Sequence, residues 1–138
     1  VRLRVKVTVQ SRQFFSGNHH SSRWWTGFYD VSLVDGFNLP ISVATHGGSG
    51  YCRASSSPTN VTMACPTKLQ MKGSDGRVLA CKSACTAFNK PNYCCTGTFN
   101  TPQTCPPTDY SRLFKQQCRQ AYSYAYDDPD STLIYLLW

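Results

Sequence analysis

Eight cysteines in a chain of 138 residues limit the possible fold more than any other feature of this sequence. An even number of cysteines is typical of a disulfide framework, which persists only in an oxidising compartment. A zinc site is the alternative, but no C-x2-C pair is present, and the adjacent residues Cys94 and Cys95 suit two different bridges better than one tetrahedral site. The sequence therefore predicts a disulfide-stabilised protein without a metal or cofactor.

The chain has the length of one domain, and nine glycines and eight prolines favour loops. Loop-rich chains depend on covalent crosslinks, because their cores are small. No stretch reaches the length of a membrane span, and the N-terminus shows no signal-peptide pattern. We therefore expect no membrane span, and either a mature chain or a fragment of a longer one.

The formal net charge is +7, and all seven acidic residues are aspartates, with no glutamate. Lysines and arginines are scattered, except in residues 1–23, where five basic residues occur without an acid. Nucleic-acid binding normally requires basic side chains that cluster on one face. The composition therefore indicates a soluble basic protein without a nucleic-acid partner.

Hydrophobic patterning predicts several short strands. Residues 1–9 alternate between apolar and basic or polar side chains, as expected for a half-buried strand. Residues 10–27 show no period and are interpreted as a loop. Strand composition returns at 28–34, before the turn signal at Asp35, and a further short strand is expected at 41–44.

Two helices are expected in the second half of the chain. A short one at 80–89 would stop before Pro91, and a clearer one at 110–120 begins after the capping pair Thr108 and Asp109. Residues 121–126 alternate again, which predicts a strand with three tyrosines on one side. These are Tyr122, Tyr124 and Tyr126.

Five motifs carry a resemblance to a known family. They are, in order, FYDVSLVDGFNLP at 28–40, CKSACTAF at 81–88, YCCTG at 93–97, PTDYS at 107–111 and AYSYAYDD at 121–128. In this order they resemble the thaumatin-like, pathogenesis-related proteins, from residue 28 to about residue 132. The resemblance implies a mainly β fold, namely an incomplete thaumatin-like β-sandwich with a disulfide-rich lobe that carries short helices.

Four segments follow from this resemblance. We expect a divergent N-terminal segment at 1–27 with an edge strand at 1–9, sandwich strands at 28–50, the disulfide-rich lobe at 51–120, and a returning strand with a divergent tail at 121–138. The abrupt loss of similarity at both ends suggests a truncated gene, a frameshift or an alternative transcript. A sandwich that lacks strands exposes sheet edges, so we expect a monomer or non-specific association.

The family pairing implies three local disulfides and leaves two cysteines over. The pairs are Cys65–Cys81, Cys85–Cys94 and Cys95–Cys105. Tyr135 and Ser57 occupy the places of the family partners of Cys52 and Cys118, respectively. These two cysteines either form a compensating bridge, which requires Cα atoms within about 7 Å, or remain thiols.

An N-glycosylation sequon begins at Asn60, in a region interpreted as a surface loop of the lobe.

The resemblance also implies a function. Family members are secreted to the apoplast or the vacuole, act in plant defence against fungi, and have an acidic cleft between sandwich and lobe to which binding of β-1,3-glucan is attributed. Asp30, Asp35 and Asp127 match the cleft acids, with Asp128 as the alternative to Asp127. Residue type alone favours Asp35 as a turn former and Asp127 as part of a solvated end, and the resemblance reverses that preference. The three tyrosines can stack on sugar rings or form ordinary sandwich packing.

Cleavage of a glycosidic bond requires a carboxylic acid in addition to a carboxylate. The cleft glutamate and arginine of the family have no counterpart here. We therefore expect binding of β-1,3-glucan or another fungal cell-wall polysaccharide without catalysis; the alternatives are a weak endo-β-1,3-glucanase and a truncated product without function. His19, His20 and His46 lie in loop-like sequence without a catalytic signature.

Overall fold

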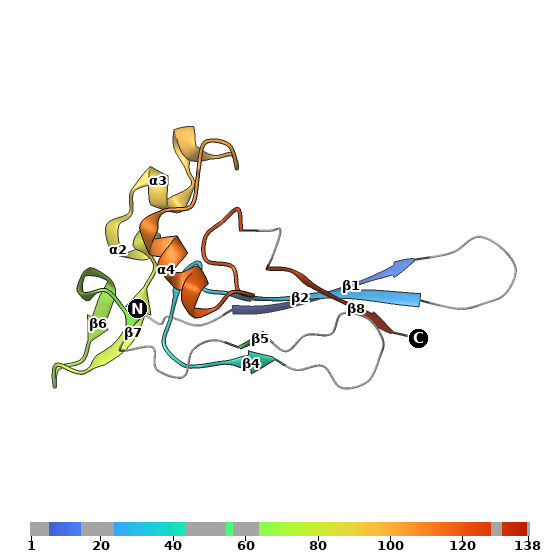
Figure 1. Cartoon of the computed structure of the whole chain (residues 1–138), viewed down its shortest axis with the longest axis horizontal. Helices are drawn as coiled ribbons and strands as arrows, with labels where there is room; N and C mark the ends of the chain where they lie inside the picture. Colours follow the sequence, from blue (N-terminus) through green and yellow to red (C-terminus); the bar gives the residue numbers. More distant parts are fainter. Residues whose placement is uncertain (1–5, 15–23, 44–54, 57–63, 128–130, 138) are drawn as a thin grey trace, which may run out of the picture.

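A computed structural model describes residues 6–14, 24–43, 55–56, 64–127 and 131–137. A long, narrow sheet forms one part of the molecule, and a lobe of short helices forms the other (Figure 1). The chain leaves the sheet after residue 32, builds most of the lobe, and returns to the sheet near residue 122.

The long sheet has three antiparallel strands in the order β1-β2-β8. Its strands are β1 (Lys6–Phe14), β2 (Trp24–Ser32) and β8 (Leu133–Leu137). β2 alternates as a half-buried strand should, since Tyr29 and Val31 are buried and Asp30 between them is partly exposed. One face of β2 therefore belongs to the core.

The predicted first strand is confirmed from Lys6 onwards, whereas residues 1–5 lie outside the described residues. The loop prediction for 10–27 is wrong at both of its ends. β1 continues to Phe14 and β2 begins at Trp24, because the two strands pair without a break from Lys6 and Ser32 to Phe14 and Trp24. Backbone pairing satisfies these residues although their side chains do not alternate.

Two smaller antiparallel sheets complete the described β structure. One has the order β3-β7-β6, with β3 (Gly36–Phe37), β7 (Val78–Lys82) and β6 (Gln70–Lys72); the other pairs β4 (Ser42–Val43) with β5 (Ser55–Ser56). Gly36 has φ of 110°, and a Cβ there would overlap the carbonyl oxygen of Cys81, so only glycine fits. The described strands form an antiparallel fold without a complete two-sheet sandwich.

Short helices make up the rest of the lobe. They are η1 (Thr67–Leu69), α2 (Ala84–Phe88), α3 (Pro91–Cys94), η2 (Gly97–Phe99) and α4 (Asp109–Gln117). Both predicted helices are confirmed in shorter form, as α2 and α4. Thr108 begins α4 through a reciprocal capping box with Ser111, and Asn89 ends α2 in the left-handed conformation.

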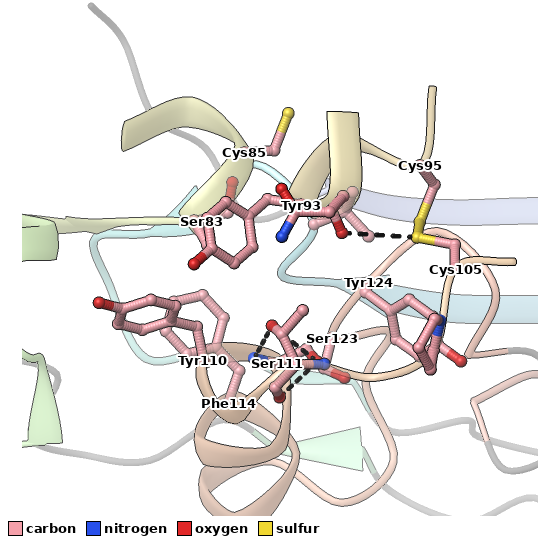
Figure 2. A pocket seen from close by; sticks show the side chains of 15 residues that line it. Ser83, Cys85, Tyr93, Cys95, Cys105, Tyr110, Ser111, Phe114, Ser123 and Tyr124 are labelled. Atoms are coloured by element: carbon pink, nitrogen blue, oxygen red, sulfur yellow. Dashed lines mark hydrogen bonds between the residues drawn. A yellow bond between two sulfur atoms is a disulfide. The ribbon is translucent and has the colours of Figure 1, made fainter. Parts of the chain in front are cut away.

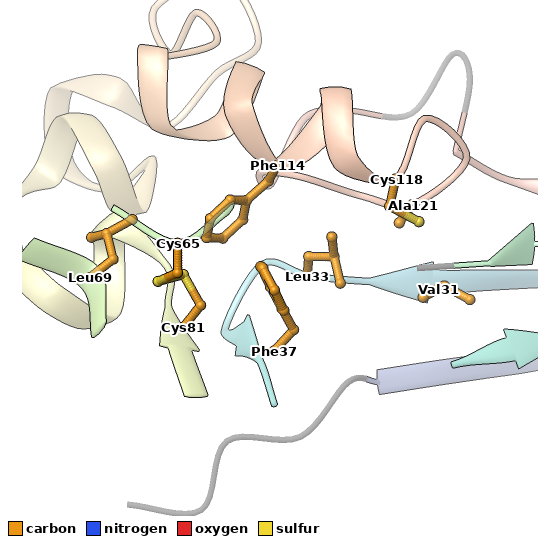
Figure 3. Close-up of a cluster of buried hydrophobic side chains, with 9 residues drawn as sticks. All are labelled: Val31, Leu33, Phe37, Cys65, Leu69, Cys81, Phe114, Cys118 and Ala121. Carbon is orange, nitrogen blue, oxygen red and sulfur yellow. A yellow bond between two sulfur atoms is a disulfide. The ribbon is translucent and has the colours of Figure 1, made fainter. Parts of the chain in front are cut away.

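Among the described residues three disulfides hold the lobe, and they are the pairs that the resemblance implies. They are Cys65–Cys81, Cys85–Cys94 and Cys95–Cys105. Cys65 and Cys81 also belong to the hydrophobic core between sheet and lobe (Figure 3). At its centre the rings of Phe37 and Phe114 meet edge to face, with centroids 5.1 Å apart. The core therefore joins β2, β3, β7 and α4 into one unit.

The predicted strand at 121–126 is wrong. Only Tyr122 makes a β-bridge, a parallel one to Ser32, with Tyr122 N donating to the Val31 carbonyl and Leu33 N donating to the Tyr122 carbonyl, both at 2.8 Å. The chain then turns, because Oδ2 of Asp127 accepts hydrogen bonds from the backbone N and the Oγ of Ser123, each 2.8 Å long. This side-chain acceptor competes with an extended backbone.

Candidate functional site

Of the predicted cleft acids Asp30 and Asp35, Asp35 is exposed and Asp30 is partly exposed. Asp30 lies on the face of β2 opposite to buried Val31, so it points away from the core shared with α4. Asp35 is exposed in a turn in which Gly36 N donates to the Leu33 carbonyl at 2.9 Å.

The backbone of Asp35 is attached to the lobe. Its carbonyl accepts hydrogen bonds from Ser83 N at 3.4 Å and from the Oγ1 of Thr86 at 3.1 Å, where α2 begins. The start of α2 therefore fixes the position of the turn, while the side chain of Asp35 remains exposed.

The carboxylate of Asp127 is bound by other side chains of the protein. Besides the two bonds from Ser123, its Oδ2 lies 3.1 Å from Nζ of Lys115, and the two side chains are 15% and 25% exposed, respectively. Lys115 is on α4, which packs on the Val31 face of β2. The structure therefore places Asp127 on the α4 side of β2 and Asp30 on the opposite side.

Lys115 is the centre of a small polar cluster. In addition to the ion pair with Asp127, Nζ donates hydrogen bonds to the Ala121 carbonyl at 3.3 Å and to the Oγ of Ser131 at 2.8 Å. Lys115, Ala121, Asp127 and Ser131 are called the Lys115 cluster. It ties both ends of the turn after α4 to the helix.

The three predicted tyrosines do not share a face. The hydroxyl groups of Tyr122 and Thr132 form a hydrogen bond of 2.6 Å, and the Tyr126 hydroxyl donates to the Asn100 carbonyl. Tyr124 instead lines a pocket in the lobe. The prediction of a common sugar-binding side is therefore wrong, because residues 123–127 form a turn and not a strand.

The pocket lies between α2, α3, α4 and the chain around Val34 and Tyr124 (Figure 2). Three buried serines contribute to its wall: Ser83, Ser111 and Ser123. Its volume of about 30 Å³ can hold a water molecule or a single hydroxyl group, but no sugar ring. At this pocket a carbohydrate could therefore contact the lining residues, Tyr93 and Tyr110 among them, only from outside.

Sequence reasoning missed Lys115, Tyr93 and Tyr110. Lys115 gave no local signal, since its partners lie on other segments, up to 16 residues away. Tyr93 and Tyr110 were present in two of the family motifs, but only the packing of α3 against α4 brings their rings together.

Several predicted residues lie outside the described residues. These are Cys52, Asn60, the alternative acid Asp128, and the histidines His19, His20 and His46. In the described ranges no three histidine, cysteine or acidic side chains are grouped in a way that could hold a metal ion. None of the described helices has the length and apolar character needed to cross a membrane.

Cys118 is buried in the core, and burial is the largest cause of the raised pKa of its thiol. A raised pKa lowers the fraction of reactive thiolate at a given pH. We expect Ellman's reagent at pH 8 to leave Cys118 unmodified over minutes in the folded protein. Thiol titration in guanidinium then distinguishes the two alternatives for Cys52 and Cys118. Two reactive thiols indicate unbridged cysteines, and none indicates a Cys52–Cys118 bridge. Rapid reaction of Cys118 in the folded chain would contradict its burial.

Antiparallel sheets, three disulfides and a lobe of short helices define a disulfide-stabilised, mainly β protein. The Thaumatin family model matches residues 6–136, and the chain therefore belongs to the thaumatin family. This match begins before residue 28, so the five motifs set the N-terminal limit of the resemblance too narrowly. Thaumatin-like defence proteins are generally secreted.

Individual relatives agree with this assignment. The chain is 71% identical over 105 residues to Thaumatin-like protein 1 of Castanea sativa, and 62% identical over 105 residues to a glucan endo-1,3-beta-glucosidase of Prunus avium. It is 55% identical to pathogenesis-related thaumatin-like protein 3.5 of Cryptomeria japonica. Each alignment covers 76% of this chain and 43% of the relative, so the chain matches less than half the length of these proteins.

Proposed function

We propose that this chain belongs to a secreted plant defence protein that binds β-1,3-glucan of fungal cell walls without cleaving it. The exposed carboxylate of Asp35 carries the proposal, because the lobe fixes its turn next to Val34 and Ser83, which line the pocket. Carboxylates are strong acceptors for sugar hydroxyls. The relative from Prunus avium, whose name specifies a 1,3-β-glucan substrate, supports this choice of ligand.

Hydrolysis is less well supported. A glycosidase needs two carboxyl groups about 5 to 10 Å apart on opposite sides of one bond. The chain has no glutamate, Asp127 is engaged by Lys115 and Ser123, and Asp30 lies on the other side of β2. A weak glucanase that uses Asp30 and Asp35 is the second candidate, and the name of the Prunus avium relative favours it.

A pull-down on insoluble curdlan, followed by a reducing-sugar assay on laminarin, tests both candidates. We expect the chain to bind curdlan, and Asp35→Asn to weaken binding roughly tenfold through loss of a charge-assisted hydrogen bond. Asp75→Asn is the matched control, since Asp75 is an exposed turn aspartate in the β6–β7 hairpin. We expect no release of reducing sugar.

Three results would contradict the proposal. Equal binding of wild type and Asp35→Asn would exclude Asp35 as the ligand-binding residue. Laminarin turnover that disappears in Asp30→Asn would favour the glucanase. A chain without a cooperative thermal transition by circular dichroism would favour a truncated product without function.

A further inference from the structure

Three aromatic rings from three different helices meet on the lobe. Phe88 ends α2, Tyr93 lies in α3, and Tyr110 lies in the first turn of α4. The ring centroids are 5.5 Å apart for Phe88 and Tyr93, 5.5 Å for Phe88 and Tyr110, and 5.8 Å for Tyr93 and Tyr110. These residues are called the lobe aromatic cluster. All three side chains are only partly buried, so the cluster reaches the surface.

The cluster is held rigidly. The Cys85–Cys94 disulfide joins α2 to α3 next to Tyr93, and the capping box of Thr108 and Ser111 fixes the first turn of α4 around Tyr110. Rings whose positions are fixed before binding lose little conformational entropy when a ligand covers them. A preformed aromatic surface of this kind favours ligand binding.

The cluster is continuous with the site proposed above. Tyr93 and Tyr110 line the small pocket together with Ser83, and the backbone N of Ser83 donates to the Asp35 carbonyl. In Figure 2 the two tyrosine rings lie one above the other, with both phenol oxygens on the side away from Tyr124. In the described part of the chain, neither phenol oxygen has a protein hydrogen-bond partner.

We infer that the lobe aromatic cluster is a stacking subsite for a glucose ring of the β-1,3-glucan chain, an inference that rests on the proposed function. The apolar face of a pyranose stacks on aromatic rings, and phenol hydroxyls can exchange hydrogen bonds with sugar hydroxyls. Tyr93 and Tyr110 offer both groups together.

Calorimetric titration with laminarihexaose tests the subsite. We expect Tyr110→Leu, which removes a ring, to weaken binding about fivefold to tenfold. The double variant Tyr93→Phe/Tyr110→Phe keeps the rings and loses only the hydroxyls, so it should weaken binding about threefold to tenfold with little change in folding. Phe99→Leu is the control, because Phe99 is a partly buried aromatic residue outside the lobe aromatic cluster, in a neighbouring groove that shares Asn92, Pro106 and Thr108 with the pocket.

The outcomes separate the subsite from the proposed function. Undiminished affinity in the double phenylalanine variant and in Tyr110→Leu, while Asp35→Asn remains weakened, overturns the subsite alone. Absence of hexaose binding by the wild type overturns both. An equal loss in Phe99→Leu also overturns the subsite, because the effect would then not be specific to the cluster. Should Tyr110→Leu fail to fold, the double variant decides.

Discussion

Replacement of both Cys65 and Cys81 by alanine is expected to lower the free energy of unfolding by about 3–5 kcal/mol and the melting temperature by about 10–20 °C. The bridge closes a loop with a sequence separation of 16, which accounts for about 3 kcal/mol through the entropy of the unfolded chain. The remainder arises from the cavity left by the two buried sulfur atoms, which contact the core. Thermal and guanidinium unfolding followed by circular dichroism measures both quantities.

The double variant Cys85→Ala/Cys94→Ala is the matched control. Its bridge has a sequence separation of 9, and both cysteines are only partly buried. We expect a loss of about 2–3 kcal/mol, almost all from loop entropy. A loss as large as that of the Cys65 and Cys81 variant would show that core burial does not add to the entropic effect.

Replacement of Lys115 by methionine is expected to destabilise the protein by about 2–3 kcal/mol. The variant leaves Oδ2 of Asp127 without its cation and removes the Nζ donor from Ser131 Oγ and from the Ala121 carbonyl, which keeps only the hydrogen bond from Ser131 Oγ at 3.3 Å. Removal of one partner from a largely buried ion pair is costly, because the remaining charge stays desolvated. Asp127→Asn should cost a similar amount, as judged from urea unfolding curves.

The double variant Lys115→Met/Asp127→Asn measures the interaction energy between the two side chains. We expect its loss to fall short of the sum of the single losses by about 1–2 kcal/mol, because no unpaired charge remains. The control is the ion pair of Arg112 and Asp109 on the same helix, which is exposed and should contribute under about 0.5 kcal/mol. Strict additivity for Lys115 and Asp127 would show that their proximity has no energetic effect.

Local signals predicted several elements well. The capping pair before α4 and the break before Pro91 placed both helices to within a few residues, since these signals act over a single turn. The family motifs supplied the three disulfide pairs. Alternation also predicted a strand over residues 1–9, and residues 6–9 of it belong to β1, which pairs with β2.

Long-range contacts explain what the sequence did not reveal. Residues 121–126 have the alternation of a strand, yet the ion pair with Lys115 and the Ser123 bonds of Asp127 fold them into a turn. Nor did residues 10–14 and 133–137 carry a pattern that identified their partner, and both form strands by pairing with β2. At the candidate site, the family motifs identified which aspartates to consider. The face on which each carboxylate lies depends on these tertiary contacts, so it could not be predicted.

The parallel bridge between Ser32 and Tyr122 has a topological consequence. The two points at which the chain leaves and re-enters the sheet are hydrogen-bonded neighbours, so the intervening lobe is an insertion with adjoining ends. The entropy of closing such a loop grows only with the logarithm of its length. Insertions in the exposed turns of the lobe would therefore cost the sheet little stability, whereas changes to α4 would disturb the core that it shares with β2. This architecture leaves the lobe free to diverge in evolution, with new ligand contacts, while the register of the strands stays the same.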